Sequence, residues 1–280
     1  MTIWLAIIYG VVQGLTEFIP VSSSGHLALA QNFLAGGVDQ LFIEMINLGT
    51  LLALLIAFRK KLWSILQDIF IKRNFKLAIN LLITAIPAAI LGLTLSDFIA
   101  ETHFFGATVV VALAMMLVGL IMIFLNPIIA RLNARHFQIT SVANVRTLKI
   151  NNLRKKQALV IGLSQSVALI PGVSRSGATI ITGRLLGLDS RDAAEYSFLA
   201  SIPLFCGVVA KGFLSSSDRA YWSANFWPLV IGNLAAFVVG IIAIRFLLAY
   251  LKRQNSLRLF GIYRVALASS VLIFLLLTQL

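Results

Sequence analysis

The sequence predicts an all-α polytopic membrane protein with six transmembrane helices and two re-entrant helical hairpins in an inverted-topology repeat. Hydrophobic residues make up 59% of the 280 residues, charged residues only 12%, and the mean hydropathy is +0.95. A soluble domain is only about 45–50% apolar, so this composition indicates an integral membrane protein. The positions of the cations and a repeated motif then predict how the chain crosses the membrane.

The cations gather in the gaps between apolar runs. Six Lys or Arg lie within residues 59–76, seven within 131–156 and three within 252–258, whereas 96–106 contains none. Because cytoplasmic loops carry an excess of Lys and Arg, the three basic gaps are expected in the cytoplasm and 96–106 outside. The net charge of +13 therefore indicates topology and contacts with membrane lipids, and not nucleic acid.

About 20 apolar residues cross a bilayer core of about 30 Å. Six predicted spans meet this length: 40–58, 77–96, 107–127, 192–212, 222–248 and 260–279. Two other apolar stretches, 1–35 and 157–188, are interrupted by Pro20 and Pro171 with nearby serines. Counting crossings between the basic gaps makes each a re-entrant hairpin, the first dipping from outside and the second from the cytoplasm. Irregular backbone at this depth requires surrounding protein or a wet cavity.

The two interrupted stretches resemble each other. "GVVQGLTEFIPVSSSG" from Gly10 to Gly25 aligns with "GLSQSVALIPGVSRSG" from Gly162 to Gly177 at an offset of 152, which places Ser22 on Ser174. One membrane domain, 1–280, is therefore expected to comprise repeat one (1–127), a cytoplasmic basic linker (128–156) and repeat two (157–280). Three crossings per repeat give opposite orientations, an architecture whose sites lie where broken helices meet near the midplane.

The tips of the two hairpins are expected to bind an anion. After Pro20, the serines and Gly25 suit the N-cap and first turn of a helix, so Ser22 and Ser24 are expected to be caps rather than catalysts. Free N–H groups at such a helix start favour an anion. The second tip, "PGVSRSGAT", adds Arg175, whose guanidinium suits bidentate phosphate binding. Together the tips predict a phosphate or diphosphate site.

The first tip also carries groups suited to a reaction. Glu17 can bind a divalent cation through oxygen or act as a base, and His26 can transfer protons near neutral pH. Ser23 can act as a nucleophile if a neighbouring base activates its hydroxyl. These residue types indicate hydrolysis of a phosphoanhydride.

Structural roles stay open for several charged residues. Arg175 could form a salt bridge with Glu17 or Glu195 that locks the repeats together. Glu44 matches Glu195 at an offset of 151, and this pair could hold helix ends or line the cavity. Ionisable residues at membrane depth are costly and usually functional, which favours roles in the site for Glu17 and Arg175 and leaves both roles open for Glu44 and Glu195.

The segments "QGLTEFIPVSSSGH" and "PGVSRSGAT" resemble the two signatures of the undecaprenyl-diphosphatase family, the bacitracin-resistance type of bacterial membrane phosphatase. The resemblance covers essentially the whole chain. It implies an enzyme that removes one phosphate from undecaprenyl diphosphate and so recycles the lipid carrier of peptidoglycan synthesis. It also implies a divalent cation, Mg²⁺ or Ca²⁺, and a site open to the outer face of the inner membrane.

The resemblance assigns a role to each motif residue. It implies that Glu17 binds the metal or acts in acid–base chemistry, that Ser23 is the nucleophile and that His26 transfers protons, although either of the last two could attack. Arg175 is implied to bind the phosphates. The family pattern allows Glu or Gln at Gln13, and Gln cannot serve as an anionic metal ligand or base. The expected substrate contacts are Gln13, Ser22, Ser24, Gly25, Ser174, Ser176, Gly177 and Thr179.

A second class of function fits the same architecture. Inverted repeats with broken helices are typical of secondary transporters, so the site could carry a polyprenyl phosphate across the membrane without hydrolysing it. The reactive residues Glu17, Ser23, His26 and Arg175 favour an enzyme. The sequence leaves the oligomeric state open, a homodimer included.

Overall fold

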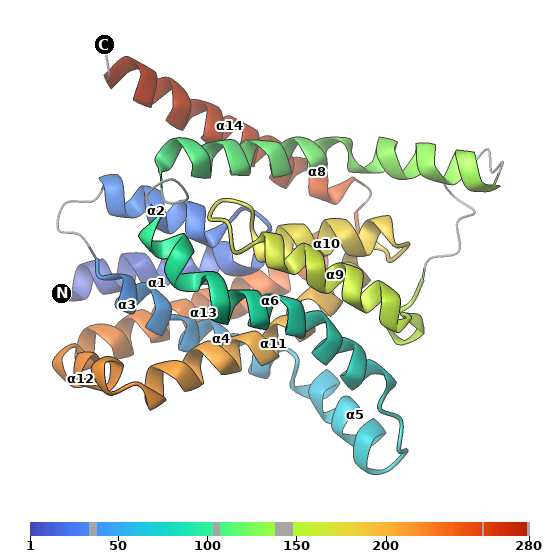
Figure 1. Ribbon diagram of the computed structural model, residues 1–280, viewed down its shortest axis with the longest axis horizontal. Helices are drawn as coiled ribbons and strands as arrows, with labels where there is room; N and C mark the ends of the chain where they lie inside the picture. The colour runs from blue at the N-terminus through green and yellow to red at the C-terminus, as the bar shows by residue number, and fades with distance from the viewer. Residues whose placement is uncertain (34–37, 103–106, 138–147, 254, 279–280) are drawn as a thin grey trace.

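Figure 1 shows the computed structural model, which describes residues 1–33, 38–102, 107–137, 148–253 and 255–278. Within these residues the chain is almost entirely helical, with one isolated β-bridge between Leu148 and Leu188. The elements are α1 (Ile3–Phe18), α2 (Ser23–Phe33), α3 (Gln40–Met45), α4 (Asn47–Ala57), α5 (Arg59–Phe70), α6 (Lys76–Glu101), α8 (Thr108–Phe137), η2 (Ile150–Asn152), α9 (Lys155–Val167), α10 (Arg175–Leu185), α11 (Ser190–Leu214), α12 (Ser216–Ala224), α13 (Phe226–Tyr250) and α14 (Ser256–Thr278).

Six segments of the described chain are long and apolar enough to cross a membrane, which confirms the predicted all-α polytopic class. They are Gln40–Ala57, Lys76–Leu95, Thr108–Leu132, Ser190–Leu214, Phe226–Tyr250 and Ser256–Thr278. The chain is therefore a multi-pass membrane protein. The fifth segment begins four residues later than predicted, because residue 222 belongs to the short helix α12.

The basic gaps contain more helix than the charge pattern indicated. Residues 59–70 form α5, and its apolar Ile65 is buried. Helix α8 continues to Phe137, so the first part of the predicted linker 128–156 is helical. Residues 138–147 of that linker lie outside the described residues. Amphipathic spacing allows a helix to form beside a membrane without crossing it.

Each interrupted stretch forms a helix–turn–helix pair. Helix α1 ends at Phe18, and Ile19 is extended at φ −65° and ψ 132° because the residue before Pro20 is disfavoured in the α region. At about 1.5 Å per residue, the 16 residues of α1 and the 11 residues of α2 and of α10 are each shorter than a bilayer core of about 30 Å.

The two turns have the same local geometry at the predicted offset of 152. Ser22 has φ 78° and Ser174 has φ 75°, a region that non-glycine residues rarely adopt. The Ser22 Oγ accepts a hydrogen bond from Gly25 N at 3.2 Å, and the Ser174 Oγ accepts one from Gly177 N at 3.1 Å. Both serines are therefore N-caps of the second helix of their pair, as expected for Ser22. Such backbone strain costs about 1–3 kcal/mol and occurs mainly at functional sites.

Each pair packs against a long helix of the other half of the chain. Helix α1 lies along α13, and α9 lies along α6 (Figure 1). A Cβ on Gly10 would overlap the Gly232 oxygen, and a Cβ on the matching Gly162 would lie 2.7 Å from the Thr84 oxygen. Small residues of this kind let helix backbones approach closely in a membrane. Because each pair packs on a helix of the other half of the chain, the turns of both pairs lie together in the middle of the bundle.

Candidate active site

The carboxylate of Glu17 lies at the centre of a cluster formed by both turns. Its Oε1 accepts a hydrogen bond from Arg175 Nη2 at 2.6 Å, and its Oε2 accepts one from Ser23 Oγ at 2.6 Å. The Glu17 and Arg175 side chains are only 10% and 17% exposed. Glu17 comes from the last turn of α1, whereas Ser23 and Arg175 are the first residues of α2 and α10. The structure thus joins three of the four predicted catalytic residues.

A cavity of about 240 Å³ opens beside this cluster. Its polar wall consists of residues from both turns, and its apolar wall belongs largely to α11. The lining residues are Glu17, Ser23, Ser24, Ala168, Ser174, Arg175, Leu204, Phe205 and Val208. The cavity therefore offers hydroxyls, a carboxylate and a guanidinium on one side and apolar surface on the other, which suits a ligand with a charged head and an apolar tail.

Gln13 extends the cluster away from the cavity. Its Nε2 donates to Glu17 Oε2 at 3.0 Å and to Asn47 Oδ1 at 2.9 Å, and the residue is 2% exposed. Gln13 and Glu17 are spaced i, i+4 on α1, which places them on one helix face, whereas nothing in the sequence indicated Asn47. Gln13 therefore orients the Glu17 carboxylate and does not line the cavity.

Of the other predicted substrate contacts, two line the cavity and five do not: Ser22, Gly25, Ser176, Gly177 and Thr179. Ser24 and Ser174 line the cavity, and Ser24 Oγ also accepts a hydrogen bond from Gly172 N at 3.3 Å, which ties the two turns together. Ser176 is buried, and its Oγ lies 3.2 Å from Ser174 Oγ. The buried Thr179 hydroxyl lies 2.5 Å from Ser197 Oγ and so joins α10 to α11.

His26 lies on α2, one turn after the cap, and faces α14. Its Nδ1 donates to Ser22 O at 2.7 Å, because a carbonyl can only accept, and its Nε2 lies 2.7 Å from the Tyr263 hydroxyl. The His26 and Tyr263 rings are stacked, with centroids 5.7 Å apart. His26 is not among the cavity-lining residues. Its predicted role in proton transfer stays a prediction.

Arg264 on α14 is the main residue that sequence reasoning missed. It is fully buried, and its guanidinium donates to the carbonyls of Met115 at 3.1 Å, Pro20 at 3.3 Å, Gly172 at 2.6 Å and Val173 at 3.1 Å. Arg264 thus binds the backbone of both turns and places a second positive charge near the site. An arginine inside the predicted span 260–279 is itself a functional signal, because a charge at that depth is costly.

Arg175 is also held by an aromatic ring. Its Cζ lies 4.2 Å from the centroid of Phe205, a buried residue of α11. A cation above a ring face is stabilised by the ring quadrupole, and the effect grows when the pair is desolvated. Among the alternatives left open by the sequence, Arg175 pairs with Glu17, while Glu195 pairs with Lys61 Nζ at 3.6 Å.

The donor set decides which metal the site could hold. Among the described residues no three His, Cys, Asp or Glu side chains lie together, and Glu17 is the one carboxylate that lines the cavity. This set does not suit Ca²⁺ bound by a protein cage of six to eight oxygens. It fits Mg²⁺, which is commonly held by one or two carboxylates together with substrate phosphates.

The fold and the cluster define a polytopic membrane protein with a buried site for an anionic, amphipathic ligand. The family model described as "Bacitracin resistance protein BacA" matches residues 6–270. The chain belongs to this family.

Curated relatives match the chain over nearly its whole length. An undecaprenyl-diphosphatase of Korarchaeum cryptofilum is 34% identical and covers 97% of this chain and 99% of its own length. That of Enterococcus faecalis is 34% identical over 95% of each chain, and that of Janthinobacterium sp. is 37% identical over 96% and 93%.

Proposed function

We propose that this protein hydrolyses undecaprenyl diphosphate to undecaprenyl phosphate and phosphate, recycling the lipid carrier of peptidoglycan synthesis. Membership of the family and the names of the relatives support this activity. The observation that carries it is the Glu17 carboxylate, which contacts a serine hydroxyl and an arginine at 2.6 Å each. Transport without hydrolysis is not favoured, since the relatives are named as diphosphatases.

The geometry supports Ser23 as the nucleophile. A serine is weak until a base removes its proton, and Ser23 Oγ already donates to Glu17 Oε2. The Ser23 oxygen attacks the terminal phosphorus, its proton passes to Glu17, and the bond to the bridging oxygen breaks, so that undecaprenyl phosphate leaves with that proton. Water then attacks the phosphoserine, gives a proton to Glu17 and releases phosphate, and Glu17 returns the proton to Ser23.

Arg175 binds the charge that the reaction concentrates on the phosphates. Its remaining N–H groups can form paired hydrogen bonds with phosphate oxygens while Nη2 stays near Glu17. In a site shielded from water such fixed donors stabilise a transition state strongly. The stacking on Phe205 keeps the guanidinium in place.

The proposed cation is Mg²⁺, held by Glu17 together with the diphosphate oxygens of the substrate. When bound, it would neutralise the diphosphate and stabilise the leaving phosphate. Substrate oxygens would be needed as further ligands, because Glu17 is the one carboxylate among the described residues that line the cavity.

The protein is proposed to lie in the bacterial inner membrane, with the α1–α2 pair entering from outside and the α9–α10 pair entering from the cytoplasm. The matched serine caps and the exchanged packing of the two pairs support this inverted repeat. Cysteine labelling in spheroplasts tests the orientation after the exposed Cys206 is replaced. In the C206S background, S223C should be labelled directly and N74C only after permeabilisation; the opposite pattern would overturn the orientation.

Phosphate release by the purified protein tests the activity. The protein in detergent is incubated with a polyprenyl diphosphate, with and without EDTA, and Mg²⁺ or Ca²⁺ is then restored. We expect cation-dependent release that is lost in Arg175→Ala and kept in Arg191→Ala, because Arg191 is exposed on α11. Release that needs no cation would contradict the metal proposal, and no release by the unmodified protein would contradict the function.

A further inference from the structure

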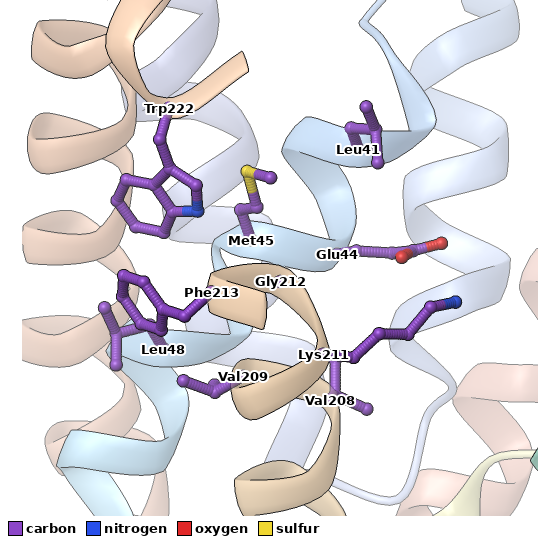
Figure 2. Close-up of a pocket in the computed structure, with 10 residues that line it drawn as sticks. All are labelled: Leu41, Glu44, Met45, Leu48, Val208, Val209, Lys211, Gly212, Phe213 and Trp222. Atoms are coloured by element: carbon purple, nitrogen blue, oxygen red, sulfur yellow. The ribbon is translucent and has the colours of Figure 1, made fainter. Parts of the chain in front are cut away.

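A second, smaller cavity of about 20 Å³ lies beside α11 (Figure 2). Residues of α3, α4, α11 and α12 surround it: Leu41, Glu44, Met45, Leu48, Val208, Val209, Lys211, Gly212, Phe213 and Trp222. Val208 lines both cavities, so the two are neighbours along one face of α11. The second cavity therefore adjoins the one beside the Glu17 cluster at Val208.

The two sides of this second cavity differ in chemistry. Figure 2 shows the Glu44 carboxylate and the Lys211 ammonium extending in the same direction on one side, with the rings of Phe213 and Trp222 on the other. Among the described residues Lys211 forms no ion pair within 4.0 Å, with Glu44 or any other carboxylate, so its ammonium can attract another anion. A charged side and an aromatic side together suit an amphipathic lipid.

The equivalent residues of the other repeat behave differently. Glu195 follows Glu44 by 151 positions, and Lys61 precedes Lys211 by 150. Lys61 Nζ lies 3.6 Å from Glu195 Oε1, so these two residues form an ion pair where their counterparts line a cavity. In both places the glutamate and the lysine come from different repeats. One end of the α4–α11 contact is thus closed by an ion pair, whereas the other end has the small cavity and no ion pair among the described residues; we call it the open end.

We propose that this open end is the entrance to the active site, where Lys211 makes the first contact with the diphosphate head group and the aromatic side receives the start of the prenyl chain. The proposal rests on the proposed function. A cation beside an opening raises the local concentration of an anionic ligand and speeds its association. Glu44 opposes this effect, so the two side chains should change substrate binding in opposite directions.

Steady-state hydrolysis of undecaprenyl diphosphate in detergent tests the entrance. We expect Lys211→Gln to raise KM about three- to fivefold, the range of a partly exposed charge contact, with kcat nearly unchanged. Lys211→Arg should restore KM, and Glu44→Gln should lower it. Lys61→Gln is the matched control at the equivalent position and should leave KM unchanged. The difference in KM between Lys211→Gln and the unmodified protein should become smaller in high salt, because salt screens exposed charges.

The outcomes separate this inference from the function on which it rests. An unchanged KM in Lys211→Gln, or an equal rise in Lys61→Gln, would overturn the entrance while the hydrolase stands. An unmodified protein that releases no phosphate would overturn the hydrolase itself. Size-exclusion elution of each variant as a single peak confirms that the comparison is made on folded protein.

Discussion

The carboxylate of Glu17 accepts a hydrogen bond from Arg175 Nη2 at 2.6 Å, although the two residues are 158 positions apart. The first helix pair contributes the acid Glu17 and the proposed nucleophile Ser23, and the second contributes the cation Arg175. Neither helix pair alone contains the acid, the serine and the cation, so the set is complete only where the two pairs meet. The contact also neutralises two charges at membrane depth, where an unpaired charge would be costly.

Glu17→Gln removes the base while keeping the shape of the side chain. We expect kcat to fall at least about 100-fold, because general base catalysis contributes about 10²–10⁴. The amide oxygen can still accept from Arg175, so the variant should fold, and its melting temperature serves as the control. Phosphate release at more than a tenth of the unmodified rate would show that Glu17 is not the base.

Ser23→Ala removes the proposed nucleophile. The loss should exceed about 100-fold in kcat, since the attacking oxygen is gone. Ser24→Ala provides the comparison, because its hydroxyl accepts from Gly172 N and makes no contact with Glu17. A smaller loss is expected there, and mass spectrometry of the acid-quenched enzyme should detect a phosphate on Ser23. Equal losses in the two variants would exclude a special role for Ser23.

Much of the fold could be predicted because hydropathy and cation position act locally along the chain. The six spans follow from runs of about 20 apolar residues. The short amphipathic helix α5 was missed because its cations marked residues 59–76 as a gap between spans, and its apolar residues are too few to form a span. The break at Ile46 between α3 and α4 also carries no proline or glycine to reveal it.

The site could be predicted only where its residues lie in motifs. Glu17, Ser23 and Arg175 stand in the two similar segments, so repetition revealed them. Arg264 and Phe205 lie alone in apolar helices, and their contacts depend on how distant helices pack. His26 stands in a motif as well, yet its ring faces Tyr263, because periodicity along a short helix does not fix which neighbour each face meets.

Gln13→Glu should increase the affinity of the site for Mg²⁺. The new carboxylate would replace an amide that donates to Glu17 Oε2 at 3.0 Å, so two negative groups would adjoin. A divalent cation relieves that repulsion, and two carboxylates are a common Mg²⁺ set. We expect the Mg²⁺ concentration for half-maximal phosphate release to fall about fivefold or more. This corresponds to roughly 1 kcal/mol of additional binding free energy. An unchanged requirement would place the cation away from Glu17.

Arg264→Ala should destabilise the protein strongly. The change leaves three carbonyl oxygens of the two turns without the Arg264 donor, and a buried unsatisfied group costs about 1–3 kcal/mol. A total of at least about 3 kcal/mol lowers the melting temperature by about 6 °C or more for a chain of this size. Arg258→Ala, exposed on the same helix, should shift it by less than about 2 °C. Similar shifts in both variants would contradict the clamping role.

Gly10→Ala and Gly162→Ala test the exchanged packing of the two helix pairs. Alanine is the better helix former by about 1 kcal/mol, so an unconstrained site should gain stability. At Gly10 and Gly162, however, the added methyl group meets a backbone oxygen of α13 or α6, and backbone cannot move aside cheaply. Both variants should therefore lower the melting temperature in detergent. Gly92→Ala is the matched control, because its Cβ would lie 3.8 Å from Leu169, an ordinary contact. A gain in stability at Gly10 or Gly162 would show that α1 and α9 do not pack closely on these helices.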